Sequence, residues 1–291
     1  MRVLKWIGIA LVVLLGVIAT AAVILSFIGG SKMNQTVEVQ AENIPIPNDA
    51  AALERGEHLV KTACLSCHAS DMTGRAIFDE PGLGTLYAPN LTALAEDHSD
   101  EELVLAIRHG VGHEGRPLMI MPSETFINFS AEDLGAIIAY LKTVPAAGEE
   151  TPDPAFGFLA KVMLAAGMFG QIFPSEYIDH DQPFPQMPVV GANVEYGQYL
   201  SGMCQSCHGP DLTGGQPPEP DAPPAPDLTS GGPLASWTEA EFLTAMRTGV
   251  APDGQTIDPD FMPWQSFGKL YDEELQALWI YLQEQKGEMT R

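Results

Sequence analysis

The feature that most restricts the fold of this chain is a five-residue motif that occurs twice. In each copy two cysteines are separated by two residues and followed at once by a histidine; these residues are Cys64, Cys67, His68, Cys204, Cys207 and His208. The chain has 4 cysteines, so every cysteine belongs to a motif. A Cys-x-x-Cys-His run is typical of c-type haem attachment, in which two thioethers hold the haem and the histidine binds its iron. Each motif therefore requires a fold that encloses a large, covalently held group.

Two other kinds of site contain paired cysteines. A Cys-x-x-Cys pair occurs in dithiol redox sites, and two distant pairs can complete a zinc site. Neither explains why a histidine follows both pairs, and the strand–helix–strand pattern expected around a redox dithiol is absent from this sequence. We therefore predict two haem c groups with their irons, one at each motif.

The charge of the chain excludes one class of partner. Asp and Glu number 38 against 14 Lys and Arg, which gives a formal net charge of −24. Binding to nucleic acid needs basic patches that displace counterions, so no nucleic-acid partner is expected. The acidic surface fits either docking with a basic partner or solubility through self-repulsion.

The N-terminal segment predicts a membrane anchor. From Trp6 to Ile28 the chain carries no charge, and these about 23 residues suffice to cross the hydrocarbon core as a helix. Arg2 and Lys5 precede this stretch, which predicts a cytoplasmic N-terminus and an extracytoplasmic remainder. A cleaved signal peptide is the alternative, because Ala19-Thr20-Ala21 resembles a cleavage site, but the apolar run continues beyond it. We predict a retained single-pass helix in the cytoplasmic membrane, with the haem domains on the periplasmic side.

The remainder of the chain is one pattern written twice. Both haem motifs are followed by Asp-x-Thr-Gly and then by Ala-Pro-x-Leu-Thr, at 71–74 and 88–92 in the first copy and at 211–214 and 225–229 in the second. We divide the chain into an anchor (1–32), a flexible polar tether (33–47), a first domain (48–146), an apolar linker segment (147–189) and a second domain (190–287).

Helix signals recur at matching places in both copies, whereas strand-like alternation is nearly absent. Capping boxes at Ser99 and Thr238, each with a glutamate three residues later, predict helices that end at Gly110 and Gly249. Further helices are expected at the ends of each copy: Ala50–Thr62, Ser130–Lys142, Val194–Met203 and Asp272–Glu284. We predict an all-α protein with two tandem domains behind one N-terminal transmembrane helix.

The second protein ligand of each iron is predicted to be a methionine. Met121 and Met262 stand at matching places, and each is followed by a proline, which stiffens the loop that carries the thioether. No histidine outside the motifs occurs at the same place in both copies. Met119 is the competing candidate in the first copy, but the second copy has Asp260 there. The predicted metal ligands are therefore His68, Met121, His208 and Met262.

Two further pairs of matched residues have two interpretations each. Pro89 and Pro226 either place a carbonyl that accepts the Nδ1–H of the iron-bound histidine or are ordinary turn prolines. Arg108 and Arg247, at matching helix ends, either face a haem propionate or complement the helix dipole.

With these motifs, both copies resemble the class I cytochrome c family. In that family the first and last helices cross at a glycine–aromatic contact, for which Gly56 with Tyr140 and Gly197 with Tyr281 are the matching residues. The loops also resemble those of membrane-bound cytochrome subunits that accept electrons from extracytoplasmic dehydrogenases or deliver them to oxidases. Alcohol and sugar-acid dehydrogenase subunits of this kind usually carry three haem motifs, whereas this chain carries two. The cytochrome subunit of the high-affinity haem–copper oxidases has two haem domains behind an anchor.

The resemblance implies an electron carrier rather than an enzyme, without a small-molecule substrate of its own. Expected partners are redox proteins of a respiratory or photosynthetic chain: a dehydrogenase, a quinol-oxidising complex, an oxidase or a reaction centre. One alternative is a haem enzyme, such as a peroxidase or a thiosulfate-oxidising cytochrome, which needs an exchangeable ligand at one iron. The other is a structural or docking subunit of a respiratory complex, in which the haems are incidental to assembly. The matched Met-Pro pairs argue against the haem enzyme.

The linker contains an apolar segment, Ala155–Phe173, with Lys161 as its one charge. A membrane crossing here would put Cys204 and Cys207 in the cytoplasm, away from haem attachment. The segment is therefore a helix packed on the domains, a helix in the membrane interface or a patch for a partner. We expect packing between the domains or against a partner.

Overall fold

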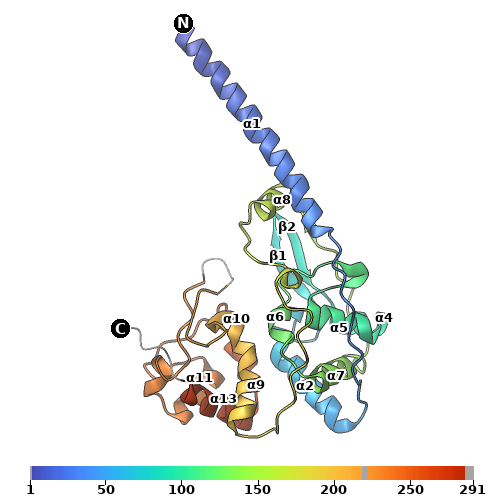
Figure 1. Ribbon diagram of the computed structural model, residues 1–291, viewed down its shortest axis with the longest axis vertical. Helices are drawn as coiled ribbons and strands as arrows, with labels where there is room; N and C mark the ends of the chain where they lie inside the picture. Colours follow the sequence, from blue (N-terminus) through green and yellow to red (C-terminus); the bar gives the residue numbers. More distant parts are fainter. Residues whose placement is uncertain (1, 218–221, 286–291) are drawn as a thin grey trace.

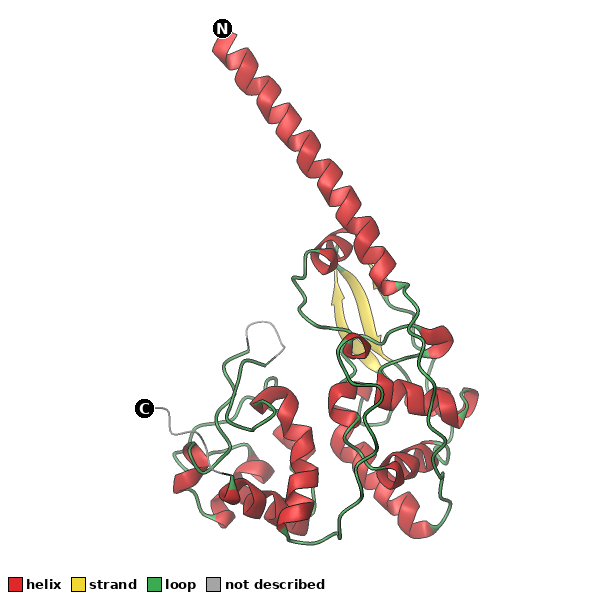
Figure 2. Ribbon diagram, viewed as in Figure 1, coloured by secondary structure: helices red, strands yellow, loops and turns green. Residues whose placement is uncertain are grey.

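In the computed structural model, which describes residues 2–217 and 222–285, a long helix projects from a body of two helical units (Figure 1). This helix, α1, runs from Arg2 to Met33 and is the one helix in the described residues that is long and apolar enough to cross a membrane. The rest of the chain is mostly helical, with a few strands in one unit (Figure 2). The predicted all-α fold class with two domains behind one apolar helix is confirmed.

The two units repeat a similar succession of helices. In the first unit these are α2 (Ala50–Ala63), α3 (Leu65–His68), α4 (Leu91–Asp97), α5 (Asp100–His109), η1 (His113–Gly115), α6 (Ser123–Phe126) and α7 (Ala131–Leu141). In the second unit they are α9 (Val194–Ser201), η3 (Gly202–Cys204), α10 (Gln205–His208), η4 (Pro233–Ser236), α11 (Glu239–Thr248), α12 (Trp264–Phe267) and α13 (Asp272–Glu284). In each unit the first long helix packs against the last, α2 on α7 and α9 on α13.

These helix pairs cross closely because each pair has a glycine at the crossing. A Cβ on Gly56 would overlap a backbone carbonyl of α7 and would lie 2.8 Å from the Cβ of Tyr140. A Cβ on Gly197 would overlap a carbonyl of α13 and would lie 2.7 Å from the Cβ of Tyr281. The expected glycine–aromatic crossing is therefore confirmed in both units.

The starts and ends of α5 and α11 follow the local sequence signals. Both predicted capping boxes are present, with Ser99 and Thr238 as the N-caps. Both helices end at a glycine in the left-handed conformation, with φ of 65° at Gly110 and 69° at Gly249. Residues with a Cβ rarely adopt this conformation, which is why glycine ends both helices.

The first unit carries a small sheet that the sequence pattern did not predict. Strands β1 (Arg75–Glu80) and β2 (Gly84–Ala88) form an antiparallel hairpin, and β3 (Ala155–Phe156) pairs with β2, giving the order β1-β2-β3. The corresponding stretch of the second unit is rich in proline, which removes ladder donors. Among its described residues it forms one isolated bridge, between Gly215 and Ala225.

The segment predicted to be a flexible tether, 33–47, instead packs along the first unit. Ile44 lies against the main core cluster. The Glu42 carboxylate accepts hydrogen bonds from the side chains of Arg108 and His109, at 2.9 and 2.8 Å. The prediction of flexibility was wrong because these partners lie far away in the sequence, where no local pattern indicates them.

The apolar linker segment forms α8 (Phe158–Ala165), followed by η2 (Pro174–Glu176). Helix α8 packs against α1 and lies beside it where α1 enters the body of the protein (Figure 1). Of the two expected positions, packing between the domains is therefore not found for α8, and packing against a partner stays a prediction. Its apolar side chains find a neighbouring apolar surface on the anchor helix instead.

The two units contact each other through equivalent surfaces. Helix α6 lies against η3 and α10, and α12 lies against α2. In both cases the short helix after the predicted methionine ligand touches the segment that leads into, or forms, the cysteine motif of the other unit. Reciprocal contacts of this kind are what an approximate two-fold axis between the units produces.

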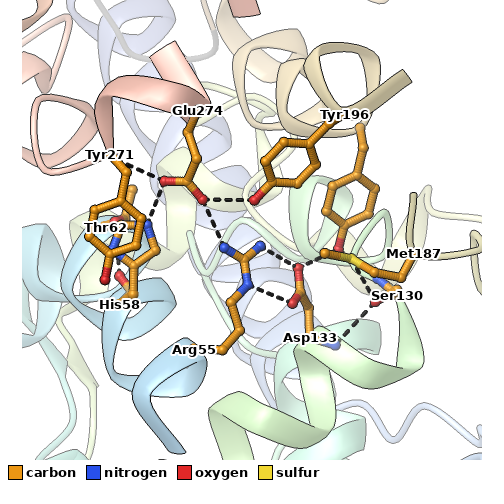
Figure 3. Close-up of polar contacts among 10 residues, drawn as sticks. Arg55, His58, Thr62, Ser130, Asp133, Met187, Tyr196, Tyr271 and Glu274 are labelled. Atoms are coloured by element: carbon orange, nitrogen blue, oxygen red, sulfur yellow. Dashed lines mark hydrogen bonds and ion pairs between the residues drawn. The ribbon is translucent and has the colours of Figure 1, made fainter. Parts of the chain in front are cut away.

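A buried network of charged and phenolic groups joins the units at the centre of this interface (Figure 3). Arg55 of α2 donates two hydrogen bonds to Asp133 of α7, at 2.9 and 2.8 Å, and one to Glu274 of α13, at 2.8 Å. His58 lies 2.6 Å from Glu274, and the Tyr199 hydroxyl donates to Asp133 at 2.7 Å. Both acidic residues are 2% exposed, so the ion pairs are shielded from water and salt.

Candidate functional site

Each cysteine motif begins where the first helix of its unit ends. Cys64 caps α2 and α3 continues to His68, while Cys204 closes η3 and α10 continues to His208. Residues three apart lie on one side of a helical turn, so the two thiols of a motif point to the same side. None of the four cysteines is in a disulfide bond, and all four are half-buried.

The first thiol of each motif differs from that of a redox dithiol. Burial raises the pKa of Cys64 and of Cys204 to about 12, and the other cysteine of each motif adds to the rise. A reactive dithiol has a lowered thiol pKa instead.

The motif histidines are held identically in both units. His68 Nδ1 lies 2.8 Å from the carbonyl oxygen of Pro89, and His208 Nδ1 lies 2.8 Å from that of Pro226. A carbonyl oxygen only accepts, so Nδ1 carries the proton and the lone pair of Nε2 is free for a metal. Burial lowers the pKa of both imidazoles, and the bond to the carbonyl opposes this only in part. Of the two interpretations of Pro89 and Pro226, the structure supports the one in which their carbonyls accept from the histidines.

The Asp-x-Thr-Gly tetrads close a turn behind each histidine. The Gly74 N–H donates to the His68 carbonyl at 3.1 Å, and the Gly214 N–H donates to the His208 carbonyl at 2.9 Å. Both glycines have positive φ, 83° and 90°. An added Cβ would lie 2.6 Å from the carbonyl oxygen of Ala88 in the first unit and 2.7 Å from that of Ala225 in the second, the residues directly before the two prolines. Glycine is therefore required for the histidine turn to approach the loop that holds the imidazole.

The two predicted methionine ligands lie in the same backbone geometry. Pro122, after Met121, has φ −79° and ψ 59°, and Pro263, after Met262, has φ −75° and ψ 59°. These angles define inverse γ-turns. The N–H two residues after each methionine donates to the methionine carbonyl, at 2.7 and 2.6 Å. Both methionines are half-buried, and Met121 packs against the same core cluster as Cys64.

Met119, the competing candidate, packs elsewhere. It lies against a separate apolar cluster formed by Leu86, Phe156 and Ala160, where the sheet meets α8. Met119 thus packs with the sheet and α8, whereas Met121 packs against the main core cluster.

Arg108 and Arg247 make a contact that neither of the two interpretations included. Arg108, which is fully buried, donates to the carbonyl of Ile127 at 2.6 Å, and Arg247 donates to the carbonyl of Gly268. Ile127 and Gly268 are the equivalent C-caps of α6 and α12, the short helices that follow the predicted methionine ligands. Each arginine also binds a carboxylate. Both arginines thus hold the methionine loop of their unit in position.

Each unit therefore contains two thiols, a carbonyl-held histidine and a methionine on a stiff turn, which are the kinds of donor group that a c-type haem takes. The fold and the site define a protein built from haem-carrying helical domains. The chain belongs to the cytochrome c family, because the Cytochrome c family profile matches residues 53–145 and 194–286.

Several curated relatives are subunits of dehydrogenases. The chain is similar to the gluconate 2-dehydrogenase cytochrome c subunit of Pantoea cypripedii, with 26% identity over 235 residues, which cover 76% of this chain and 52% of the relative. It is also similar to the cytochrome c subunit of the quinone alcohol dehydrogenase of Gluconacetobacter polyoxogenes, with 36% identity over 104 residues, 31% of this chain and 21% of the relative. A nicotinate dehydrogenase subunit of Pseudomonas putida is 40% identical over 60 residues, 21% of this chain and 5% of the relative. The chain thus spans about half, or less, of the length of these relatives.

Together, the family and the relatives support a role for this chain in electron transfer as a carrier.

Proposed function

We propose that this chain carries electrons through two covalent haems c, with His68 and Met121 as ligands of the first iron and His208 and Met262 as ligands of the second. The observation that carries the proposal is the duplication of local geometry: the same histidine–carbonyl bond and the same Met-Pro turn occur in both units. An iron with two protein ligands mainly exchanges electrons, whereas an iron with an open position binds small molecules. Cys64, Cys67, Cys204 and Cys207 would form the thioethers.

The residues around each site keep the ligands in one arrangement. When bound, each haem supplies an iron that cycles between the ferrous and ferric states. The Pro89 carbonyl fixes the tautomer and the ring plane of His68, and Arg108 holds the end of the helix that follows Met121. A ligand set that does not rearrange when the iron changes its charge favours rapid electron exchange. Pro226 and Arg247 act in the same way in the second unit.

In this proposal, electron transfer between the two haem sites would cross the interface of the units. The short helices α6 and α12, which directly follow the two predicted methionine ligands, both lie at this interface. The buried network around Arg55 fixes the two units against each other. A fixed spacing between the two sites favours transfer within the chain over transfer between separate molecules.

The haem domains lie at the outer face of the cytoplasmic membrane in this proposal. Helix α1 carries Arg2 and Lys5 before its apolar stretch, which supports a cytoplasmic N-terminus and external domains. The attachment of c-type haem outside the cytoplasm agrees with this orientation. The anchor limits the carrier to partners that meet it at the membrane surface.

The electron donor in this proposal is an extracytoplasmic dehydrogenase, as the names of the relatives suggest. The formal charge of −24 favours encounter with a basic surface on any soluble partner, and such an encounter weakens as salt screens the attraction. A permanently docked dehydrogenase would instead give electron transfer that is nearly independent of salt.

Two measurements test the proposal. Intact mass after acid–acetone extraction, which removes non-covalent haem, should exceed the polypeptide by two haems; a mass without haem would overturn the proposal. Stopped-flow reduction of the detergent-solubilised protein by a basic small cytochrome, across a salt series, then tests docking. A rate that falls steeply with salt supports a shuttle, and a flat profile with co-purification of a dehydrogenase supports a fixed subunit.

A further inference from the structure

Helix α8 lies so close to the outer end of α1 that only glycine fits between them. A Cβ on Gly29 of α1 would overlap the backbone carbonyl of Lys161 on α8. Gly29 is buried, although α1 is otherwise exposed along most of its length. The anchor helix and α8 therefore form one packed unit rather than a helix that passes near a domain.

The contact extends into the apolar stretch of α1. The half-buried or buried residues of its outer part recur on one helix face, at Ala22, Leu25, Ser26, Gly29, Gly30 and Met33. Since the apolar stretch ends at Ile28, Ala22 lies about 9 Å inside that end, at 1.5 Å per residue. Helix α8 is the helix that packs on α1, so part of it lies at the depth where a spanning α1 leaves the hydrocarbon core.

The side of α8 that faces away from the protein is apolar. Phe158 is 55% exposed and Leu159 is 52% exposed, and Met168, just beyond the helix, is 63% exposed. From residue 154 to residue 175 the chain contains one charged side chain, Lys161, and no acidic one, in a protein with 38 acidic residues. A surface that faced water would carry its share of these carboxylates.

Lys161 has the placement of a lysine at a membrane surface. An added Cβ on Gly30 would lie 3.8 Å from the Cδ of Lys161, so the lysine stem lies against α1. A buried stem with a charged end allows the ammonium group to reach lipid phosphates while the apolar part stays among chains. Residues of this kind are typical of helices that lie in the plane of the interface.

The sheet of the first unit connects α8 to the haem domain. Strand β3 pairs with β2 and runs directly into α8, and the Gly157 N–H between them donates to the Leu83 carbonyl at 2.7 Å. Phe156 of β3 packs edge-on against Phe78 of β1, with ring centroids 5.5 Å apart. The hairpin lies between α1 and the helical body of the first unit (Figure 1), so it links the membrane-proximal helix to the first site.

We propose that α8, with the residues that follow it to 170, is half-immersed in the outer leaflet of the bilayer, where Phe158, Leu159 and Met168 contact lipid acyl chains. The inference rests on the proposed membrane anchor, because the depth of α8 is set by its contact with α1. The hairpin would then hold the first haem domain at a fixed distance and orientation above the membrane, rather than on a swinging tether.

Photo-crosslinking tests this proposal on the full-length holoprotein in native membrane vesicles. A benzophenone amino acid is introduced at Leu159 or Met168, both of which are exposed and therefore tolerant of the change. After irradiation, mass spectrometry should detect phospholipid adducts at both positions. The reference position in water is Val189, which is 83% exposed and lies in the linker beyond η2, and lipid adducts there should be several-fold fewer.

A third position separates this proposal from the anchor on which it rests. Val12, in the middle of the apolar stretch of α1, is 70% exposed and should give lipid adducts if α1 spans the bilayer. Adducts at Val12 without adducts at Leu159 would overturn the immersion of α8 and leave the anchor intact. Adducts from Leu159 to another protein would overturn it in favour of a partner subunit. An absence of lipid adducts at Val12 would overturn the anchor itself.

Discussion

His58 Nε2 and a carboxylate oxygen of Glu274 lie 2.6 Å apart, although the two residues belong to different haem domains. The contact has a counterpart, because the Tyr199 hydroxyl donates to Asp133 at 2.7 Å. His58 and Tyr199 each follow the crossing glycine of their unit by two residues, and Asp133 and Glu274 each lie in the first turn of the last helix. One kind of contact is thus used twice at the interface, in opposite directions.

Replacing Arg55 by methionine should destabilise the docked units by about 3 to 5 kcal/mol, because it leaves the buried carboxylates of Asp133 and Glu274 without their cation. Guanidinium unfolding followed by circular dichroism measures the change. Glu57→Gln is the matched control, since its ion pair with Lys61 on the same helix is exposed and contributes at most about 1 kcal/mol. Equal effects of the two substitutions would show that the network does not hold the interface.

The interface should weaken in acid. Burial alone would raise the pKa of Glu274, but the hydrogen bond and charge of His58, with bonds from Tyr271 and Tyr196, lower the pKa from 4.5 to about 2. Because the pKa of Glu274 is lowered on folding, its carboxylate stabilises the folded state at any pH above the ordinary pKa of 4.5. This contribution, on the order of 3 kcal/mol, is lost as the pH falls from 4.5 toward 2. Unfolding free energies measured across this range should fall less steeply in Glu274→Gln than in the natural protein.

Met121→Ala and Met262→Ala should each remove about half of the weak far-red absorption that an iron–thioether bond gives to the oxidised protein, because each removes one of two proposed sulfur ligands. Met119→Ala, two residues from the proposed ligand, serves as the control and should leave the band unchanged, since Met119 packs against the sheet cluster. Loss of the band in the Met119 variant would reverse the assignment in the first domain.

Arg247→Met should loosen the methionine loop of the second domain. The substitution removes a charge-assisted bond to the Gly268 carbonyl, and a loss of about 1.4 kcal/mol corresponds to a tenfold change. Imidazole should therefore displace the Met262 ligand about tenfold more readily, while the first haem is unaffected. Arg247→Lys keeps the charge but loses the planar set of donors. Its imidazole affinity should lie between those of the natural protein and of Arg247→Met. Unchanged imidazole binding in Arg247→Met would exclude a positioning role.

Gly197→Ala should cost about 1 to 3 kcal/mol of folding free energy, because its Cβ would overlap the carbonyl of Ala277 at the helix crossing. Gly202→Ala is a suitable control in the next turn, where φ is −53° and the nearest atom to a Cβ is 3.5 Å away. Thermal unfolding of the second domain measures both. A Gly202 variant as unstable as the Gly197 variant would indicate a general loss of flexibility rather than a steric clash.

Local chemistry made much of this fold predictable. The capping boxes at Ser99 and Thr238 and the glycines at Gly110 and Gly249 act within a few residues, so their signals survive in the sequence alone. Because the pattern occurs twice in the chain, each local signal could be checked against the other copy. Met121 and Met262 were matched in this way. The hydrogen bonds of the Pro89 and Pro226 carbonyls were predictable for the same reason.

Contacts between distant segments were not predictable. Strand β3 pairs with β2, although it follows the first domain in the sequence. Glu42 binds Arg108, although it belongs to a segment whose composition predicts a polar tether. The contact of Arg108 with the Ile127 carbonyl leaves no pattern, because a carbonyl is present at every position. A comparison of the two copies does not predict the interface network, because matching positions carry different residues, such as Arg55 and Tyr196 or His58 and Tyr199.

Arg55 and Tyr196 each directly precede the crossing glycine of their unit, and the guanidinium lies 6.0 Å from the centre of the tyrosine ring. In a true two-fold dimer of identical units, such a position would meet itself, and two arginines would be forced together in a buried place. Because both units belong to one chain, the two positions can differ, and one cation serves two carboxylates. The interfaces of the two units are therefore complementary to each other rather than self-complementary. Each unit fits the other but would pack poorly against a second copy of itself.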